Sequence, residues 1–490
     1  MKVADLFARC SVVLSMIDEA LSDMPMVGDG AERATRLRSM LGDPADLRVR
    51  TIGAAGRVLY LATIVDEAHL EASLLQPLAG TARGASERAL LAHLVPVRTY
   101  AEALEAILSG KAIALTAQPP GAFAADVAKW PNRVPSEPAA EVITRGPHTG
   151  FVESLDDNIA LIRQGVPDPH LRYERFTVAT RSGTEGAMLY IEGVVSPKVL
   201  ERVRAALDRA LASVVTDASM LAQHLSPTAH LFPTVGTTER PDVAYGSLLE
   251  GRIVMFTSGS PTALLLPQVF AYLLAVPEDY YQRSLPATFN RTFRLIGLFA
   301  TTTVAALYVA LTTINPELIP TPLFLSISQS RLGVPMPLVF EILALEAVIE
   351  LIRQAGLRLP SAFGQSISVV GAVVIGQSAV MAGLLSAPAV VVVSLEFIAS
   401  FIVPSQTTAM TARILRFPLI LLAAAFGLFG LSLGLMLLFV YLCTLESFGV
   451  PYLAPFLPLR RRGLQDALIR LPLRRLRRSF ISRSAGAARS

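Results

Sequence analysis

The chain has 490 residues, which is too long for one compact core, so we expect two or more domains. Its formal net charge of +4 hides a partition, because residues 1–290 hold 26 Lys/Arg and 32 Asp/Glu (net −6), whereas residues 291–490 hold 17 and 7 (net +10). Only ten charged side chains occur from residue 295 to 445, and an ion at the bilayer centre costs about 2.5–3.5 kcal/mol. This excludes a wholly soluble protein and predicts an integral membrane protein with a soluble N-terminal half.

The start of the chain shows no signal peptide. The apolar run Ser11–Ile17 is short and is followed at once by two acidic residues, which is typical of an amphipathic helix. We therefore expect residues 1–290 to stay on the side of the membrane where they are made. The two cysteines, Cys10 and Cys443, lie in different halves and indicate no disulfide framework.

A weak internal repeat divides the soluble half. A predicted strand at Val58–Leu61 precedes a helical pattern at Asp66–Leu78, and 130 residues later Ala187–Ile191 and Lys198–Ala212 follow the same order. We predict two related α/β subdomains, residues 1–115 and 150–285, joined by an Ala- and Pro-rich linker at 116–149 that holds Trp130. The alternative is that one strand–turn–helix unit simply aligns with another.

Motifs for catalysis, cofactors and metals are missing. The sequence has no phosphate-cradling Gly-rich loop, no Gly-x-Ser-x-Gly and no Cys-x-x-Cys. Of six histidines only His224 and His230 are close, without nearby Cys. Asp156 and Asp157 form a possible acid/base pair, but the macrodipole favours acids in the first turn of a helix starting near Ser154. We predict no enzyme, catalytic residue, cofactor or metal.

The C-terminal half is predicted to be an α-helical polytopic membrane domain over residues 286–459. Leu295–Pro316 carries no charge in 22 residues, enough to cross the roughly 30 Å hydrocarbon core. Three more membrane-grade segments follow. These are Gln365–Leu385, Pro388–Val403 and Phe417–Leu445, the last long enough to cross once with tilt.

Carboxylates interrupt this apolar half. Pro335–Ile352 contains Glu341, Glu346 and Glu350, and the last two lie about 40° apart on one helical face at 100° per residue. Such a helix lies at the membrane interface or lines a wet space between subunits. Glu396 is isolated in an apolar run, so it is either functional or paired with Arg413 or Arg416.

The Gln365–Leu385 segment has uncharged polarity. Gln365, Ser368 and Gln377 let a helix face water in a channel, or bond to neighbouring helices. We take these three residues, with Glu346, Glu350 and Glu396, as candidate pore or wet-interface residues.

The tail at residues 460–490 holds ten arginines and one acid, Asp466. Nucleic-acid binding is one reading, but after a membrane run such a tail favours a cytoplasmic segment held by anionic lipids, without nucleic acid. With both ends cytoplasmic the span count is even. Four spans would then place Arg353 and Arg358 outside, against the positive-inside trend, so four to six spans stay open.

Several longer motifs together resemble the GerA family of spore germination proteins, over residues 50 to 475. They are Gly146-Pro147, Gly150–Leu155, Thr238–Val243, Leu248–Ile253, Pro277–Tyr281, Ala306–Thr313, Ile319–Pro322, Gly333–Pro335, Val374–Gln377 and Ser447–Leu453. Asp157, Ser258 and Ala305 depart from the commoner family residues, which leaves the subfamily open between receptor A-type subunit and the stage V sporulation AF paralogue.

The resemblance implies a spore inner-membrane protein with a cytoplasmic N-terminal domain. It implies a homo-oligomeric, channel-forming A subunit that works with a transporter-like B subunit and a lipoprotein C subunit. Nutrient binding would then release monovalent cations. A ligand-binding or scaffold subunit that does not conduct is the alternative.

Overall fold

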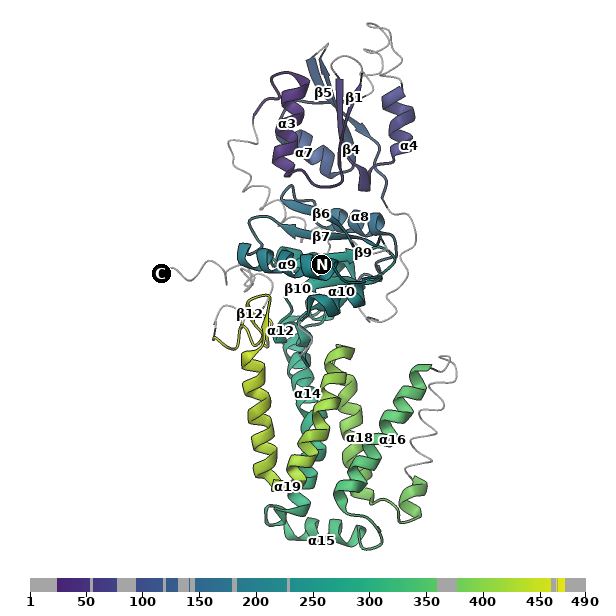
Figure 1. Cartoon of the computed structure of the whole chain (residues 1–490), viewed down its shortest axis with the longest axis vertical. Helices are drawn as coiled ribbons and strands as arrows, with labels where there is room; N and C mark the ends of the chain where they lie inside the picture. The colour runs from purple at the N-terminus through teal and green to yellow at the C-terminus, as the bar shows by residue number, and fades with distance from the viewer. Residues whose placement is uncertain are drawn as a thin grey trace.

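The computed structural model describes residues 24–52, 56–76, 94–117, 120–130, 141, 146–178, 183–226, 230–358, 377–459, 464 and 466–471. It is elongated, with two α/β layers stacked above a group of long helices (Figure 1). The described residues do not include Cys10, Gln365, Ser368, the tail beyond residue 471, or positions 118–119, 131–140 and 142–145 of the predicted linker.

The first subdomain is a five-stranded antiparallel sheet with helices on both faces. Its elements are α3 (Gly30–Leu41), β1 (Leu47–Ile52), β2 (Gly56–Leu61), a 3-10 turn (Ala62–Ile64), α4 (Glu67–Leu70), a π-helical turn (Glu71–Leu75), β3 (Val95–Val97), α7 (Tyr100–Leu108), β4 (Lys111–Ala117) and β5 (Pro120–Asp126). Alternating strand residues feed two cores, Leu59 toward α3 and α7 and Val58 toward α4. Trp130 packs against the first of these cores.

The second subdomain has the same layered construction. Its elements are α8 (Leu155–Gly165), β6 (Leu171–Thr177), β7 (Glu185–Ile191), α9 (Pro197–Leu211), α10 (Ala218–Leu225), β8 (Gly236–Thr238), α11 (Pro241–Leu249), β9 (Ile253–Thr257) and β10 (Ala263–Leu266). Ser154 caps α8 and Asp156 and Asp157 occupy its first turn, so the helix-start reading of this acidic pair is confirmed.

The two sheets share one topology. Their strand orders are β1-β2-β4-β5-β3 and β6-β7-β9-β10-β8, with every neighbouring pair antiparallel. Tyr60 lies opposite Arg48 and Tyr190 opposite Arg172, at equivalent places in the two registers. A buried ion pair between Asp46 and Arg163, 2.6 Å apart, joins the subdomains.

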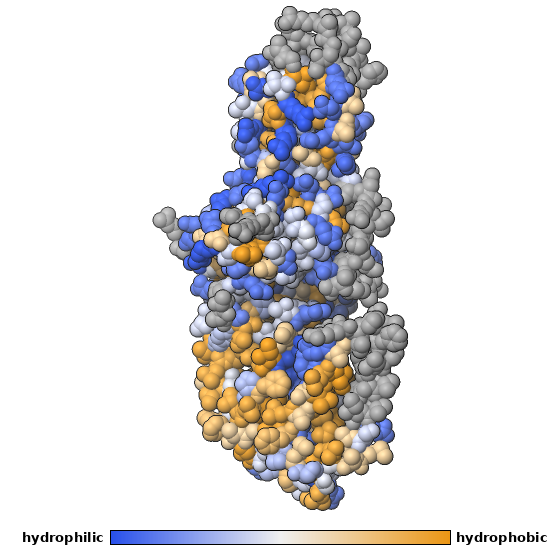
Figure 2. Space-filling model, turned by 45° about the vertical axis from the view of Figure 1, so that its right-hand side comes forward, coloured by the Kyte–Doolittle hydropathy of each residue, from blue (hydrophilic) through white to orange (hydrophobic). Residues whose placement is uncertain are grey.

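The helical region begins where the second sheet ends. Its elements are α12 (Phe270–Leu274), α13 (Glu278–Tyr281), α14 (Ser284–Thr313), a 3-10 turn (Pro316–Leu318), α15 (Thr321–Ser330), α16 (Leu338–Arg358), α18 (Ala387–Ile402), α19 (Gln406–Thr444), β11 (Glu446–Ser447) and β12 (Val450–Pro451). Within the described residues, two helices, α14 and α19, are long and apolar enough to cross a membrane, and α18 is apolar but shorter. The outer surface of this region is largely hydrophobic, in contrast to the α/β layers (Figure 2).

The prediction of one tilted span over Phe417–Leu445 is wrong. Gly427 has φ +62° and ψ −142°, which divides α19 into two helices. A Cβ built on Gly430 would meet Leu422, and one on Gly434 would meet Leu419, so the second half folds back along the first. The turn is held by Asn315, whose Oδ1 accepts from the Leu428 N–H at 3.0 Å.

This hairpin changes the direction of the helices around it. Arg353 near the end of α16 donates to Ser400 Oγ at 2.9 Å, close to where α18 ends at Ile402, on the side of the second subdomain (Figure 1). Glu341 near the start of α16 lies at the opposite end, beside Ser386. The structure therefore places Arg353 on the same side as the α/β layers.

Candidate functional site

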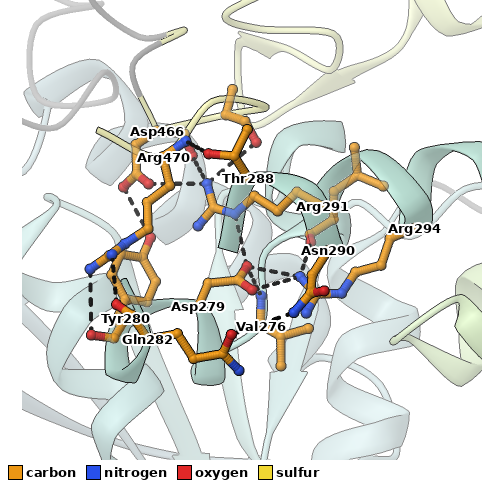
Figure 3. A network of polar contacts seen from close by, with 12 residues as sticks. Val276, Asp279, Tyr280, Gln282, Thr288, Asn290, Arg291, Arg294, Asp466 and Arg470 are labelled. Atoms are coloured by element: carbon orange, nitrogen blue, oxygen red, sulfur yellow. Dashed lines mark hydrogen bonds and ion pairs between the residues drawn. The ribbon is translucent and has the colours of Figure 1, made fainter. Parts of the chain in front are cut away.

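The joint between the α/β layers and α14 is built on one buried carboxylate. Asp279 of α13 is 1% exposed, and its two oxygens accept from Arg291 Nε at 2.8 Å and from Arg294 Nη1 at 2.9 and 2.8 Å (Figure 3). A spacing of three residues puts both arginines on one face of α14. The charged approach to the membrane run is thus folded inward as a charge cluster.

A C-terminal segment, residues 464 and 466–471, lies across this cluster; we call it the C-terminal strap. Asp466 Oδ1 lies 3.1 Å from Arg291 Nη1, and its Oδ2 accepts from Tyr280 Oη at 3.0 Å. The Arg470 N–H donates to Thr288 Oγ1 at 3.1 Å, and its side chain donates to the Gln282 carbonyl (Figure 3). Burial raises the pKa of Asp466.

A second joint fixes the far end of α19 to the same subdomain. Ser447 Oγ donates to the Thr234 carbonyl at 2.7 Å and accepts from the Gln268 N–H at 3.0 Å. Tyr452, fully buried, donates to the Pro233 carbonyl at 3.1 Å. The far end of α19 is therefore attached to the second subdomain, and the start of the helical region is attached to it through Tyr281 of α13, which donates to Asp242 of α11 at 2.8 Å.

A cavity of about 1830 Å³ lies between these two joints, with walls from α10, α11, the start of α14 and the α18–α19 connection. Glu250 lines it and accepts from Tyr272 Oη at 2.6 Å. Burial raises the pKa of Glu250 to about 6. Arg252 packs over the Tyr272 ring, with its guanidinium carbon 4.2 Å from the ring centroid.

A second charge cluster lies inside the helical region. Arg416 of α19 is 3% exposed, donates to Glu346 of α16 and lies 3.6 Å from Glu396 of α18. The other oxygen of Glu396 accepts from the Ala305 N–H of α14 at 3.2 Å. Carboxylates of α16 and α18 thus converge on the guanidinium of α19, Glu396 also binds α14, and the pairing of Glu396 with Arg416 is found.

The remaining carboxylates of α16 also have partners. Glu350 lies 3.5 Å from Arg413 and 3.8 Å from Arg353, in a partly exposed position. Glu341 is fully buried and accepts from Ser386 Oγ at 2.6 Å. Every carboxylate of α16 and α18 therefore contacts a cation or hydroxyl of the same chain.

Of the candidate polar residues Gln365, Ser368 and Gln377, the structure describes Gln377. Gln377 is exposed, in a short helical stretch before α18, whereas Gln365 and Ser368 lie outside the described residues. The sequence analysis did not predict Asp279 and Asp466 as partners of Arg291. The signal in the sequence is an aspartate, Asp279, followed by two arginines three residues apart, Arg291 and Arg294. Among the described residues, no group of three or more His, Cys, Asp or Glu is arranged to hold a metal.

Comparison with known proteins gives a consistent result. Residues 35–480 match the family described as Bacillus/Clostridium GerA spore germination protein. Spore germination protein KA of Bacillus subtilis (strain 168) is 35% identical over 458 residues, covering 90% of this chain and 84% of that protein. Spore germination protein GerLA of Bacillus cereus is 33% identical over 472 residues, covering 92% and 94%.

Two further similarities complete the comparison. The uncharacterized membrane protein YfkQ of Bacillus subtilis (strain 168) is 35% identical over 429 residues, covering 86% of this chain and 84% of that protein. The crystal structure of the N-terminal domain of the A subunit of the Bacillus megaterium spore germinant receptor GerK3 covers 50% of this chain and 97% of its own. Its sequence identity is 25% and its TM-score 0.38.

Proposed function

Because the chain belongs to the GerA family of spore germination proteins, we propose that it is the membrane-embedded A-type subunit of a germinant receptor. We propose further that several copies assemble into a channel that conducts monovalent cations when a nutrient is sensed. No catalytic step is assigned to it.

The observation that supports a conduction path between copies is that the carboxylates of the helical region pair with arginines of the same chain. Glu346 and Glu396 contact Arg416, and Glu350 contacts Arg413, so these carboxylates face partners of their own bundle. The uncharged Gln377 is instead exposed. A path formed between copies would use such exposed polar groups, with Glu346, Glu350 and Glu396 holding the helices that surround it.

The proposed setting is the inner membrane of the spore, with the α/β layers and the basic tail on the cytoplasmic side. α14, α16, α18 and the two halves of α19 would lie in the bilayer, held by membrane lipids. The partners implied by the family are the transporter-like B subunit, which would sense the nutrient, and the lipoprotein C subunit. A sporulation AF-type role is the second candidate, favoured if the neighbouring genes lack these partners.

Cation flux from liposomes tests the proposal. The full chain, alone and with its B and C partners, is reconstituted and potassium release is followed with and without nutrient. Gln377→Leu should change the flux, while the matched Met381→Leu, at a side chain 81% exposed in the same stretch, should leave it unchanged. Absence of flux from a folded oligomer, with and without partners, would exclude the channel.

A further inference from the structure

The cavity between the two joints has an amphipathic lining. Phe401 and Ile402 at the end of α18, and Pro404 of the α18–α19 connection, form an apolar part together with Pro286. Arg283, Glu250 and other polar groups also line it. A cavity of about 1830 Å³ exceeds the roughly 300–1,000 Å³ typical of small-molecule sites, so it accommodates a larger, two-ended ligand.

The position of the cavity relative to the bilayer follows from α14. Its 30 residues span about 45 Å at 1.5 Å per residue, which matches the hydrocarbon core plus both headgroup layers. The start of α14 therefore lies at headgroup level. Gly297 lies two residues after Leu295, where the uncharged run begins. A Cβ on Gly297 would meet Ile402 at 3.0 Å, so the apolar part of the cavity lies where the hydrocarbon begins.

Arg283 gives the cavity a cationic end, and Arg240, which is ion-paired with Asp242 at 2.7 Å, adds one further donor. Arg283, exposed, immediately precedes α14 and makes no side-chain hydrogen bond or ion pair with any described residue. Arg240, 1% exposed, also lines the cavity and leaves Nη1 without a partner among the described residues. The first turn of α14 has no side-chain cap, so its free N–H groups add positive potential at the same place.

We propose that this cavity binds one phospholipid of the surrounding bilayer, with the phosphodiester at Arg283 and the acyl chains against Phe401 and Ile402. This inference rests on the proposed membrane location. A free phosphate would satisfy the cationic end but would leave Phe401, 67% exposed, and Ile402, 39% exposed, against water. The lipid would then lie between the α/β layers and the helices, and between the two joints.

Two variants test the two ends of the site separately. Gly246 of α11 lines the cavity, and a Cβ there meets nothing within 4 Å, so Gly246→Leu fills the space without a clash and favours the helix. Its control, Gly333→Leu, makes the same change at an open position in the turn before α16. Arg283→Gln removes the charge, and Arg209→Gln does so at an exposed arginine of α9.

The measurement is native mass spectrometry of the full chain, released from detergent, with thermal shifts on adding short-chain phosphatidylglycerol or inorganic phosphate. We expect one retained phospholipid in wild type and both controls, and about tenfold less in Gly246→Leu. Arg283→Gln should need about tenfold more phosphatidylglycerol for the same shift, a loss of about 1.4 kcal/mol.

Equal lipid retention in Gly246→Leu and wild type would overturn the proposal, and so would phosphate alone matching the shift given by the lipid. A chain that leaves the membrane fraction without detergent would contradict the membrane placement itself. A detergent-dependent chain whose variants all retain lipid equally contradicts this inference alone.

Discussion

At the scale of single residues, Asp279 is the group on which the joint between the α/β layers and α14 depends. Asp279→Asn leaves Arg291, fully buried, and Arg294 without their shared carboxylate. Removing one partner of a buried ion pair costs about 3–5 kcal/mol, so we expect a clear fall in the detergent-solubilised melting temperature. The matched change Asp156→Asn, at a carboxylate 65% exposed beside Arg175, should cost about 0–1 kcal/mol. Equal effects of the two changes would show that Asp279 does not hold the joint.

Glu250 gives a pH-dependent prediction at the same scale. Its pKa is raised by burial from the ordinary 4.5 to about 6, so the folded chain holds more protons than the unfolded chain between these values. Stability from this group is therefore present below about pH 4.5 and falls as pH rises to about 6. Subtracting the melting curve of Glu250→Gln from that of wild type should isolate this fall. A flat difference between pH 4 and 7 would contradict the shift.

Residue-level pairing was only partly predictable. The isolated Glu396 in an apolar run already indicates a nearby cation, because an unpaired carboxylate there is costly, and Arg416 lies beside it. The partners of Asp279 were not predictable in the same way. Asp466 reaches Arg291 across 175 positions of sequence, through a strap whose path depends on tertiary packing.

At the scale of elements, the turn at Gly427 decides how the last apolar run folds. Its backbone conformation is one that residues with a Cβ avoid, and a Cβ would lie 2.3 Å from Asn315 Oδ1. Gly427→Ala should therefore destabilise the chain by about 1–3 kcal/mol in thermal unfolding. If the run were one straight helix, the same change would stabilise it by about 0.5–1 kcal/mol, so the sign of the effect decides.

Length and hydropathy predict the existence of this element but not its shape. An uncharged run of 29 residues fits one tilted helix, and nothing in its composition requires a turn, since glycine is common in membrane helices. The turn depends on Asn315, which lies more than a hundred residues earlier. In the α/β part the apolar strands at Val58–Leu61 and Ala187–Ile191 were predictable, whereas the shared order of the two sheets required the structure.

At the scale of the whole molecule, the Gly427 hairpin affects the proposed membrane topology. It would let the chain make an even number of membrane passes and still keep Arg353 on the inner side, in line with the positive-inside trend. A single pass over the last run would leave Arg353 on the outer side, against the positive-inside trend. With the hairpin, Arg353 and Ser405 lie at the end that carries the α/β layers, and Gly333 and Gly383 lie together at the other end. The arrangement thus places Arg353 beside the α/β layers, whereas Arg331 lies at the other end, 3.6 Å from Glu341.

This arrangement predicts which positions are labelled from each side of a sealed vesicle. In a chain with Cys10 and Cys443 replaced by serine, Ser405→Cys should react with a membrane-impermeant thiol reagent on the same side as Arg209→Cys, which marks the α/β layers. Gly333→Cys should react only from the opposite side if the helices between these positions span the bilayer as proposed. Labelling of Gly333→Cys and Ser405→Cys from the same side would contradict the proposal that the helical region crosses the membrane. It would leave the description of the α/β layers and the two joints unchanged.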